Sequence, residues 1–226
     1  MTSMKTFISV TFIGIFLLSG CKKDDDNITV TDGDGNVYKT VKIDTQEWLV
    51  ENLKTTKYND GTAIPLVTDK TAWAALTTPA YCLYNNDEAS NKATYGALYN
   101  WYAVQTGKLC PIGWHIPSNE EWIIMTTYLG GESVAGDKLK EKGTTYWQSV
   151  PGSNSATNES GFTALPGGQC SDYGNFAFIG VYGFWWNSNE YNSSGAWYIR
   201  MSNGDRVVRR SDDSKNNGFS VRCIKD

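Results

Sequence analysis

The chain has 226 residues, of which 20 are lysine or arginine and 24 are aspartate or glutamate, so its formal net charge is −4. A weakly acidic chain lacks the basic surface that nucleic-acid binding requires, and we expect no nucleic-acid partner. The length, with 40% hydrophobic residues, suits one globular domain and short additional segments.

The N-terminus is typical of a secretory signal peptide. Lys5 supplies a positive charge, and residues 7–18 form an apolar stretch with few polar interruptions. A bilayer span needs about 20 apolar residues, so this stretch is too short for a transmembrane anchor. The following Leu18-Ser19-Gly20-Cys21 resembles the lipobox of bacterial lipoproteins. The resemblance implies a signal peptide over residues 1–20 and lipid on Cys21, through which the chain would attach to a membrane.

A charged segment, Lys-Lys-Asp-Asp-Asp-Asn, occupies residues 22–27. We interpret residues 21–31 as the lipidated Cys and an acidic tether, which is the simplest reading of a solvated charge run. The run also resembles the surface-export signal of Bacteroidetes lipoproteins. We therefore expect lipid anchoring in the outer membrane, with the domain at the cell surface.

Residues 32–226 are predicted to form the domain, which opens with a hairpin. Residues 37–43 alternate apolar and polar side chains, as a half-buried strand does, and residues 46–50 are a suitable return strand.

Four segments have helix-forming sequences: residues 69–76, 95–104, 118–129 and 136–142. The third has the strongest signal, because Ser118 can cap the helix while Glu121 completes a capping box. Gly130 and Gly131 then predict its end.

The C-terminal part predicts an antiparallel meander. Residues 196–201 are a strand, Asn203-Gly204 a hairpin turn and residues 206–209 the partner strand. Residues 218–224 alternate and predict a third strand. The fold class is therefore α+β, with short antiparallel strands, two or three short helices and long irregular loops.

Six segments match a known family in order: residues 34–43, 48–54, 95–104, 110–118, 161–168 and 218–223. They resemble the Fibrobacter succinogenes major paralogous domain family, found in secreted and lipid-anchored proteins, whose biochemical role is largely undefined. That family is related to the C-type-lectin-like fold, which formylglycine-generating enzymes and bacterial and phage receptor-binding proteins also use. The resemblance implies a C-type-lectin-like domain that displays loops on one face.

Four cysteines follow Cys21, namely Cys82, Cys110, Cys170 and Cys223. An even number in an exported chain suggests disulfides, although spacing alone cannot choose among three pairings, and buried free thiols are the alternative. The family resemblance implies a Cys110–Cys223 bond, because C-type-lectin-like domains often bridge an early helix region to the last strand. Cys82 with Cys170 then follows by exclusion.

Catalysis, metals and cofactors are not expected. His115 is the only histidine and has no partner identifiable in the sequence. Formylglycine-generating enzymes bind metal through a cysteine pair that Cys170 and Cys223 do not reproduce. Residues 32–36 begin like a calcium loop, but the positions that need Gly and Glu are taken by apolar residues.

A binding function is favoured by residues 183–195, which mix aromatic with small polar side chains as recognition surfaces do. Neighbouring strand residues point to opposite sides, so one of Trp185 and Trp186 is expected in the core. A charged patch on the last hairpin adds further candidates, with a plain solvated face as the alternative. The candidate ligand-binding residues are Trp185, Trp186, Asn187, Glu190, Tyr191, Arg209 and Asp212.

We therefore expect a non-catalytic cell-surface lipoprotein that binds a glycan or a protein through exposed loops. The first alternative is a structural subunit of a surface or fimbrial assembly. An enzyme of the formylglycine-generating type of fold is the less favoured alternative.

Overall fold

The computed structural model describes Met1 and residues 29–153 and 156–226. The predicted signal peptide and the lipid site at Cys21 lie outside the described residues, as does most of the predicted tether. The end of that tether differs from expectation, because Thr29–Thr31 form strand β1 and pair with the next strand. Among the described residues, no helix is long and apolar enough to cross a membrane.

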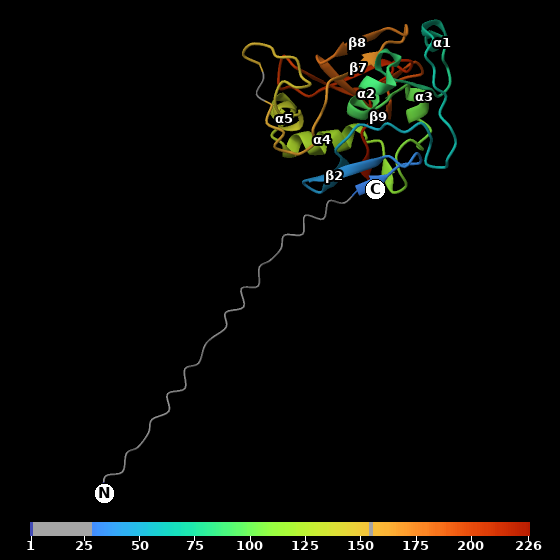
Figure 1. Ribbon diagram of the computed structural model, residues 1–226. Helices are drawn as coiled ribbons and strands as arrows, with labels where there is room; N and C mark the ends of the chain where they lie inside the picture. The colour runs from blue at the N-terminus through green and yellow to red at the C-terminus, as the bar shows by residue number, and fades with distance from the viewer. Residues whose placement is uncertain (2–28, 154–155) are drawn as a thin grey trace.

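The first sheet brings the two ends of the domain together. Its strand order is β1-β2-β3-β12-β6. After β1, its strands are β2 (Val37–Ile43), β3 (Gln46–Leu49), β12 (Ile224–Lys225) and β6 (Trp114–His115). The hairpin of β2 and β3 confirms the prediction. Since Ile224 pairs with Trp48, the C-terminus lies beside the first strands, as Figure 1 shows.

The second sheet is larger and has the order β11-β10-β9-β7-β8. Its strands are β7 (Gly167–Cys170), β8 (Phe176–Ile179), β9 (Tyr182–Glu190), β10 (Gly195–Ser202) and β11 (Arg209–Ser214). Neighbouring strands are antiparallel except for β7 and β9, which are parallel. A two-stranded sheet of β4 (Tyr81–Cys82) and β5 (Leu98–Tyr99) completes the strands of the described residues.

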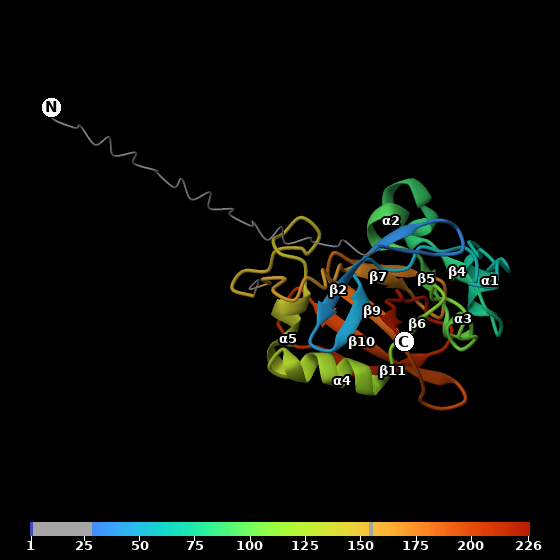
Figure 2. The same cartoon turned by 90° about the horizontal axis from the view of Figure 1, so that it is seen from below.

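The described helices are more numerous than the two or three expected. They are α1 (Lys70–Ala74), α2 (Glu88–Tyr95), α3 (Trp101–Val104), α4 (Asn119–Tyr128), α5 (Glu132–Leu139) and a 3-10 helix over Tyr84–Asn86. The capping box of Ser118 and Glu121 at the start of α4 is confirmed. Figure 2 shows α4 and α5 beside β9 and β10.

Residues 95–104, expected as one helix, are split into the end of α2, then β5, then α3. Gly96 causes the break, because its φ is 78° and a Cβ atom there would lie 2.5 Å from the carbonyl oxygen of Leu53. Only glycine fits such a close backbone approach with a positive φ.

The prediction that residues 206–209 form the partner strand of the last hairpin was wrong, because the partner strand begins only at Arg209. The strand that pairs with β10 is β11, with Arg200 opposite Arg209 and Gly195 opposite Ser214. The loop over residues 203–208 packs instead on α5, where the Gly136 amide donates to the Arg206 carbonyl at 2.9 Å. The Lys140 ammonium also donates to the carbonyls of Ser202 and Asp205. These contacts are distant in sequence, so a local turn signal did not reveal them.

Residues 218–224 do not form the third strand of a meander. The segment runs between the two sheets, with single bridges from Phe219 to Tyr99 and from Ser220 to Trp185. Only Ile224 and Lys225 form strand β12, in the first sheet. This central segment therefore contacts both sheets.

The central segment carries a buried cation, Arg222, which is 1% exposed. Its Nη1 donates to the carbonyls of Leu49 at 3.1 Å and Phe162 at 2.7 Å, and its Nη2 donates to Oδ1 of Asn52 at 3.0 Å. The guanidinium also stacks 4.2 Å from the Phe162 ring centroid. Burial lowers the pKa of Arg222 to about 9, so the side chain stays protonated at neutral pH.

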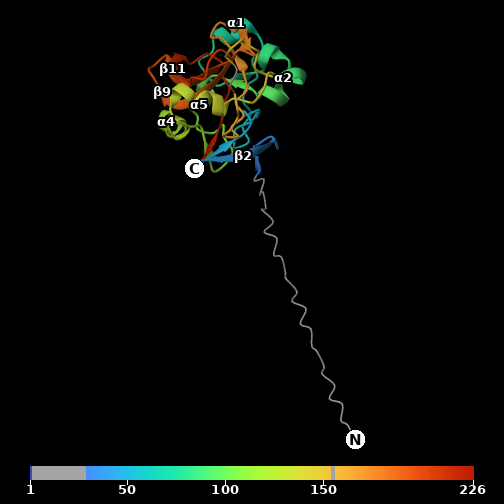
Figure 3. The same cartoon turned by 90° about the vertical axis from the view of Figure 1, so that its left-hand side faces the viewer.

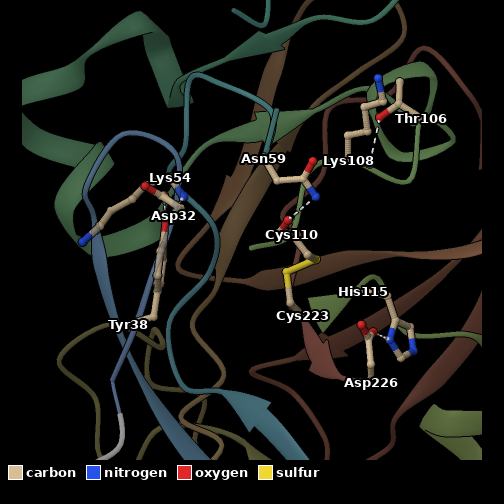
Figure 4. The surroundings of a disulfide bond; sticks show 10 residues. All are labelled: Asp32, Tyr38, Lys54, Asn59, Thr106, Lys108, Cys110, His115, Cys223 and Asp226. Carbon is tan, nitrogen blue, oxygen red and sulfur yellow. Dashed lines mark hydrogen bonds and ion pairs between the residues drawn. A yellow bond between two sulfur atoms is a disulfide. The ribbon is translucent and has the colours of Figure 1, made fainter. Parts of the chain in front are cut away.

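The expected Cys110–Cys223 disulfide is present and ties the segment before α4 to the residue just before β12, as Figure 4 shows. The bond closes a loop with a sequence separation of 113 residues. In the chain-entropy model, a loop of this length stabilises the fold by about 4–5 kcal/mol.

The expected Cys82–Cys170 bond is not formed, so the second pairing is corrected. Both residues are free thiols, 1% and 2% exposed, in an apolar cluster with Trp73 and Leu98. Burial raises the pKa of the Cys82 thiol, and a hydrogen bond with Cys170 raises it further. Neutral thiols of this kind pack as small apolar side chains.

The C-terminal residue is held by His115. Its Nδ1 lies 2.7 Å from Oδ1 of Asp226 and its Nε2 lies 2.8 Å from Oε1 of Glu121, so the imidazole joins β6, α4 and the chain end. Burial opposes protonation of the ring, but the hydrogen bonds of the two carboxylates outweigh it and raise the pKa of His115.

We predict that replacing Arg222 with Met lowers the free energy of unfolding by about 3–5 kcal/mol, because two buried carbonyls lose their donor. Urea unfolding at neutral pH measures the change. Arg206, which is exposed, provides the control, and Arg206→Met should change stability by less than about 0.5 kcal/mol. A loss at Arg222 no larger than at Arg206 would contradict the prediction.

We also predict that His115 stabilises the fold more at low pH. Its pKa is higher in the folded than in the unfolded state, so the contribution is full below about pH 6.5 and is lost as pH rises through the folded pKa. The difference in unfolding free energy between wild type and His115→Asn should therefore be larger at about pH 5.5 than at about pH 9. An equal difference at both pH values refutes this.

Candidate functional site

Both tryptophans proposed as ligand candidates are in the core. Trp185 and Trp186 are each 0% exposed, on opposite sides of β9. The Nε1 of Trp185 donates to Oδ1 of Asn52 at 2.8 Å, and that of Trp186 donates to the Tyr99 carbonyl at 2.8 Å. One of the two was expected to be core, and the other was wrong as a binding residue, because both faces of the sheet are covered here.

The other candidates on β9 and its turn are mostly engaged within the protein. Asn187 is buried and donates to the side chain of Asn119. Glu190 is exposed but forms an ion pair with Lys215. Tyr191 is 51% exposed and packs edge-on against Trp197, with ring centroids 5.2 Å apart.

The two charged candidates on β11 lie at different ends of the strand. Arg209 pairs with Arg200 across the ladder, whereas Asp212 lies opposite Trp197, at the same end as Tyr191. The structure therefore separates Arg209 from Glu190, Tyr191 and Asp212, and the seven candidates do not form one site.

Around Arg209 the second sheet carries what we call the arginine–aromatic surface, made by Phe178, Tyr182, Arg200 and Arg209. The Arg200 guanidinium carbon lies 5.1 Å from the Tyr182 ring centroid. The Phe178 ring lies edge-on to Tyr182, with centroids 5.2 Å apart. These contacts place a cation and two rings together on strands β8 to β10, beside the start of β11.

Phe178 has an unusual backbone conformation, with a φ of 70°, and its side chain is 46% exposed. Bulky residues rarely adopt this left-handed conformation, which costs of order 1–3 kcal/mol. The sheet is tight at this point, because a Cβ atom on Gly168 would lie 2.5 Å from the Ala177 carbonyl oxygen. Such strain on an exposed ring is more common at binding sites than elsewhere.

The arginines on and beside this surface differ in whether they have a carboxylate partner. Arg209 donates to both carboxylate oxygens of Asp205 at 2.9 and 2.8 Å, which lowers the pKa of Asp205. Arg210 donates to Glu132 at 2.6 Å. Arg200 forms no ion pair within the described residues, and its Nε is buried with no hydrogen-bond partner. Arg200 therefore differs from Arg209 and Arg210 in having no carboxylate partner among the described residues.

A hollow of about 350 Å³ lies beside Arg200. It is lined by Glu132, Tyr198, Arg200 and Val207 to Ser211. A half-buried arginine next to aromatic rings can donate to hydroxyl or carboxylate oxygens while the rings pack on apolar atoms.

His115 has partners that its sequence did not reveal, because both of its ring nitrogens face carboxylates. Within residues 29–153 and 156–226, no cluster of three or more His, Cys, Asp or Glu side chains could hold a metal ion. Asp32, the first residue of the rejected calcium loop, accepts hydrogen bonds from Asn36 and the Tyr38 hydroxyl instead, as part of Figure 4 shows.

The sequence marked Arg209 but not the rings beside it. Phe178 and Tyr182 stand in an apolar stretch that reads as ordinary core strand, and no residue pattern signals a positive φ at a phenylalanine. Arg200 lies in the predicted charged patch of the last hairpin but was not among the candidate ligand-binding residues.

Comparison with family models finds the Fibrobacter succinogenes major domain over residues 41–225. No curated protein and no solved structure matches the chain. The matched range begins within β2, ends within β12 and includes the arginine–aromatic surface. Since the match covers well over half of the sequence, the chain belongs to the Fibrobacter succinogenes major domain family.

Proposed function

We propose that this chain is a non-catalytic lipoprotein of the bacterial outer membrane, held at the cell surface by lipid on Cys21, and that it recognises a glycan through the arginine–aromatic surface. The observation that carries the binding proposal is that the exposed, strained Phe178 and the cation Arg200 both pack against Tyr182, while Arg200 forms no ion pair within the described residues.

A C-type-lectin-like fold is part of this proposal. It is supported by the pairing of the last strand with β3, which joins the two ends of the domain. The disulfide from Cys110 to Cys223 adds support, since it links the segment before α4 to the end of the chain. Domains of that fold bind ligands on an irregular surface. In this chain, the exposed part of the second sheet would be the binding surface.

The chemistry of the surface suits a sugar. The apolar face of a sugar ring packs well on an aromatic ring, as Phe178 and Tyr182 offer, and a guanidinium donates to ring substituents in fixed directions. Phe178 and Arg200 both pack against Tyr182 before any ligand binds, which limits the conformational entropy lost on binding.

The orientation of the domain fits attachment by its N-terminus. Strand β2, with which β1 pairs, and the C-terminus lie at one end, while β8 lies at the other (Figure 1). A membrane attached through Cys21 would therefore leave β8, which carries Phe178, on the distal side.

We predict that the full-length chain, purified in mild detergent, binds a defined subset of an immobilised glycan array. Phe178→Asn and Arg200→Gln should each weaken that binding at least about tenfold, equivalent to 1.4 kcal/mol. Asparagine tolerates positive φ, so Phe178→Asn removes the ring without adding strain.

The matched control is Tyr128→Asn, which removes an exposed ring on α4, outside the proposed surface. It should leave glycan binding unchanged. Absence of any glycan bound by wild type, or equal binding by all three variants, would overturn the proposal.

We further predict that Cys21 is acylated. A clickable fatty-acid probe should label the wild-type protein in growing bacteria, and Cys21→Ala should abolish the label because the thiol is the attachment atom. Cys82→Ala, at a buried thiol, is the control and should retain it. Equal labelling of wild type and Cys21→Ala rules out this anchor.

A further inference from the structure

The strand β11 has one unpaired edge. It lies at the end of the strand order of the second sheet and pairs only with β10. Figure 3 shows it at the margin of the molecule. Residues 210–213 are exposed. The edge is therefore accessible to another strand.

The outward backbone groups of this edge follow from its hydrogen bonding. The amide of Val208 donates to the Glu132 carbonyl at 2.8 Å, away from β10. Backbone groups alternate along an antiparallel strand, so Arg210 and Asp212 also direct their N–H and C=O groups outward.

The charges of β11 are self-complementary. Its sequence from residue 209 is Arg-Arg-Ser-Asp-Asp. If two copies pair antiparallel about Ser211, Arg209 faces Asp213 of the second copy and Arg210 faces Asp212 of the second copy. The two-fold axis repeats both contacts with the two copies exchanged, so the dimer has four pairs of opposite charge.

Other registers are disfavoured by charge. Residues directly opposite must lie on the same face of the extended sheet, so the register can shift only in steps that keep the faces aligned. Shifting the register one step in one direction places Arg210 opposite Arg210 of the second copy. Shifting it one step in the other direction places Asp212 opposite Asp212 of the second copy. Like charges directly opposite are repulsive.

The carboxylates of the edge are free to take these partners. Asp212 and Asp213 form no ion pair within the described part of the chain, although Asp213 accepts the Ser214 amide. Arg209 and Arg210 each have one internal carboxylate, but a guanidinium has five N–H donors and can serve a second.

We infer that β11 is a self-recognition edge, through which two copies of this chain form an antiparallel dimer with a two-fold axis at Ser211. The ladder is short, and exposed ion pairs contribute little each, so the dimer is weak in dilute solution and weakens further with salt. Confinement of both copies on one membrane raises their effective concentration. The inference does not depend on glycan binding.

A cross-link at the axis tests the pairing. In the proposed register the two Ser211 residues form a non-hydrogen-bonded pair with Cα atoms about 4.5 Å apart, which suits a disulfide. Full-length Ser211→Cys, at high concentration with oxidised glutathione, should give a disulfide-linked dimer. Ser193→Cys, at an exposed serine off the edge, is the matched control and should give at least about tenfold less.

Charge reversal in the Ser211→Cys background tests the register. Arg210→Asp and Asp212→Arg should each reduce the cross-link at least about tenfold, because like charges then face each other. An equimolar mixture of the two variants should restore it, since every opposing pair is again of opposite charge. Arg206→Asp, off the strand, should have no effect.

Restoration in the mixture also shows that both variants are folded. A cross-link that is no stronger at residue 211 than at residue 193 overturns the inference. So does charge reversal without effect, or a mixture that remains monomeric while each variant keeps the Cys110–Cys223 bond. Glycan-array binding by a monomeric variant would leave the proposed function intact.

Discussion

The buried guanidinium of Arg222 is the interaction on which the arrangement of the domain depends. Arg222 forms no ion pair among the described residues, so its donors are satisfied by neutral acceptors, the carbonyls of Leu49 and Phe162 and the side chain of Asn52. Asn52 also accepts from Trp185, so one hydrogen-bond network joins β3, the central segment and β9. The second sheet, and with it the arginine–aromatic surface, is positioned through these contacts.

Local sequence patterns predicted the elements that depend on local contacts. The alternation over residues 37–43 and the capping box at Ser118 each involve neighbours within a few residues, and both appear as expected. The register of β11 and the path of residues 218–224 depend on α5 and on both sheets. No short pattern encodes such distant partners, so the predicted meander failed.

The candidate site was predicted in part for the same reason. Aromatic residues near glycine and serine were read as a recognition surface, yet Trp185 and Trp186 fill the core because the sheet is covered on both faces. Phe178, which no pattern marked, is exposed instead, on a backbone with positive φ that its local sequence does not signal. The cysteines divide similarly: the family resemblance identified the Cys110 bond, whereas exclusion failed for Cys82.

The disulfide has a mechanical consequence. Phe178, Tyr182, Arg200 and Arg209 all lie between Cys110 and Cys223, within the covalently closed loop. When a load pulls between this surface and the N-terminus, the disulfide sets no limit on the extension of the chain before Cys110, but it limits the extension of the chain after it. The three-residue pairing of β1 with β2 would peel first and extend the tether. The load would then reach β2 and β3, while the closed loop limits how far the loaded surface itself can unravel.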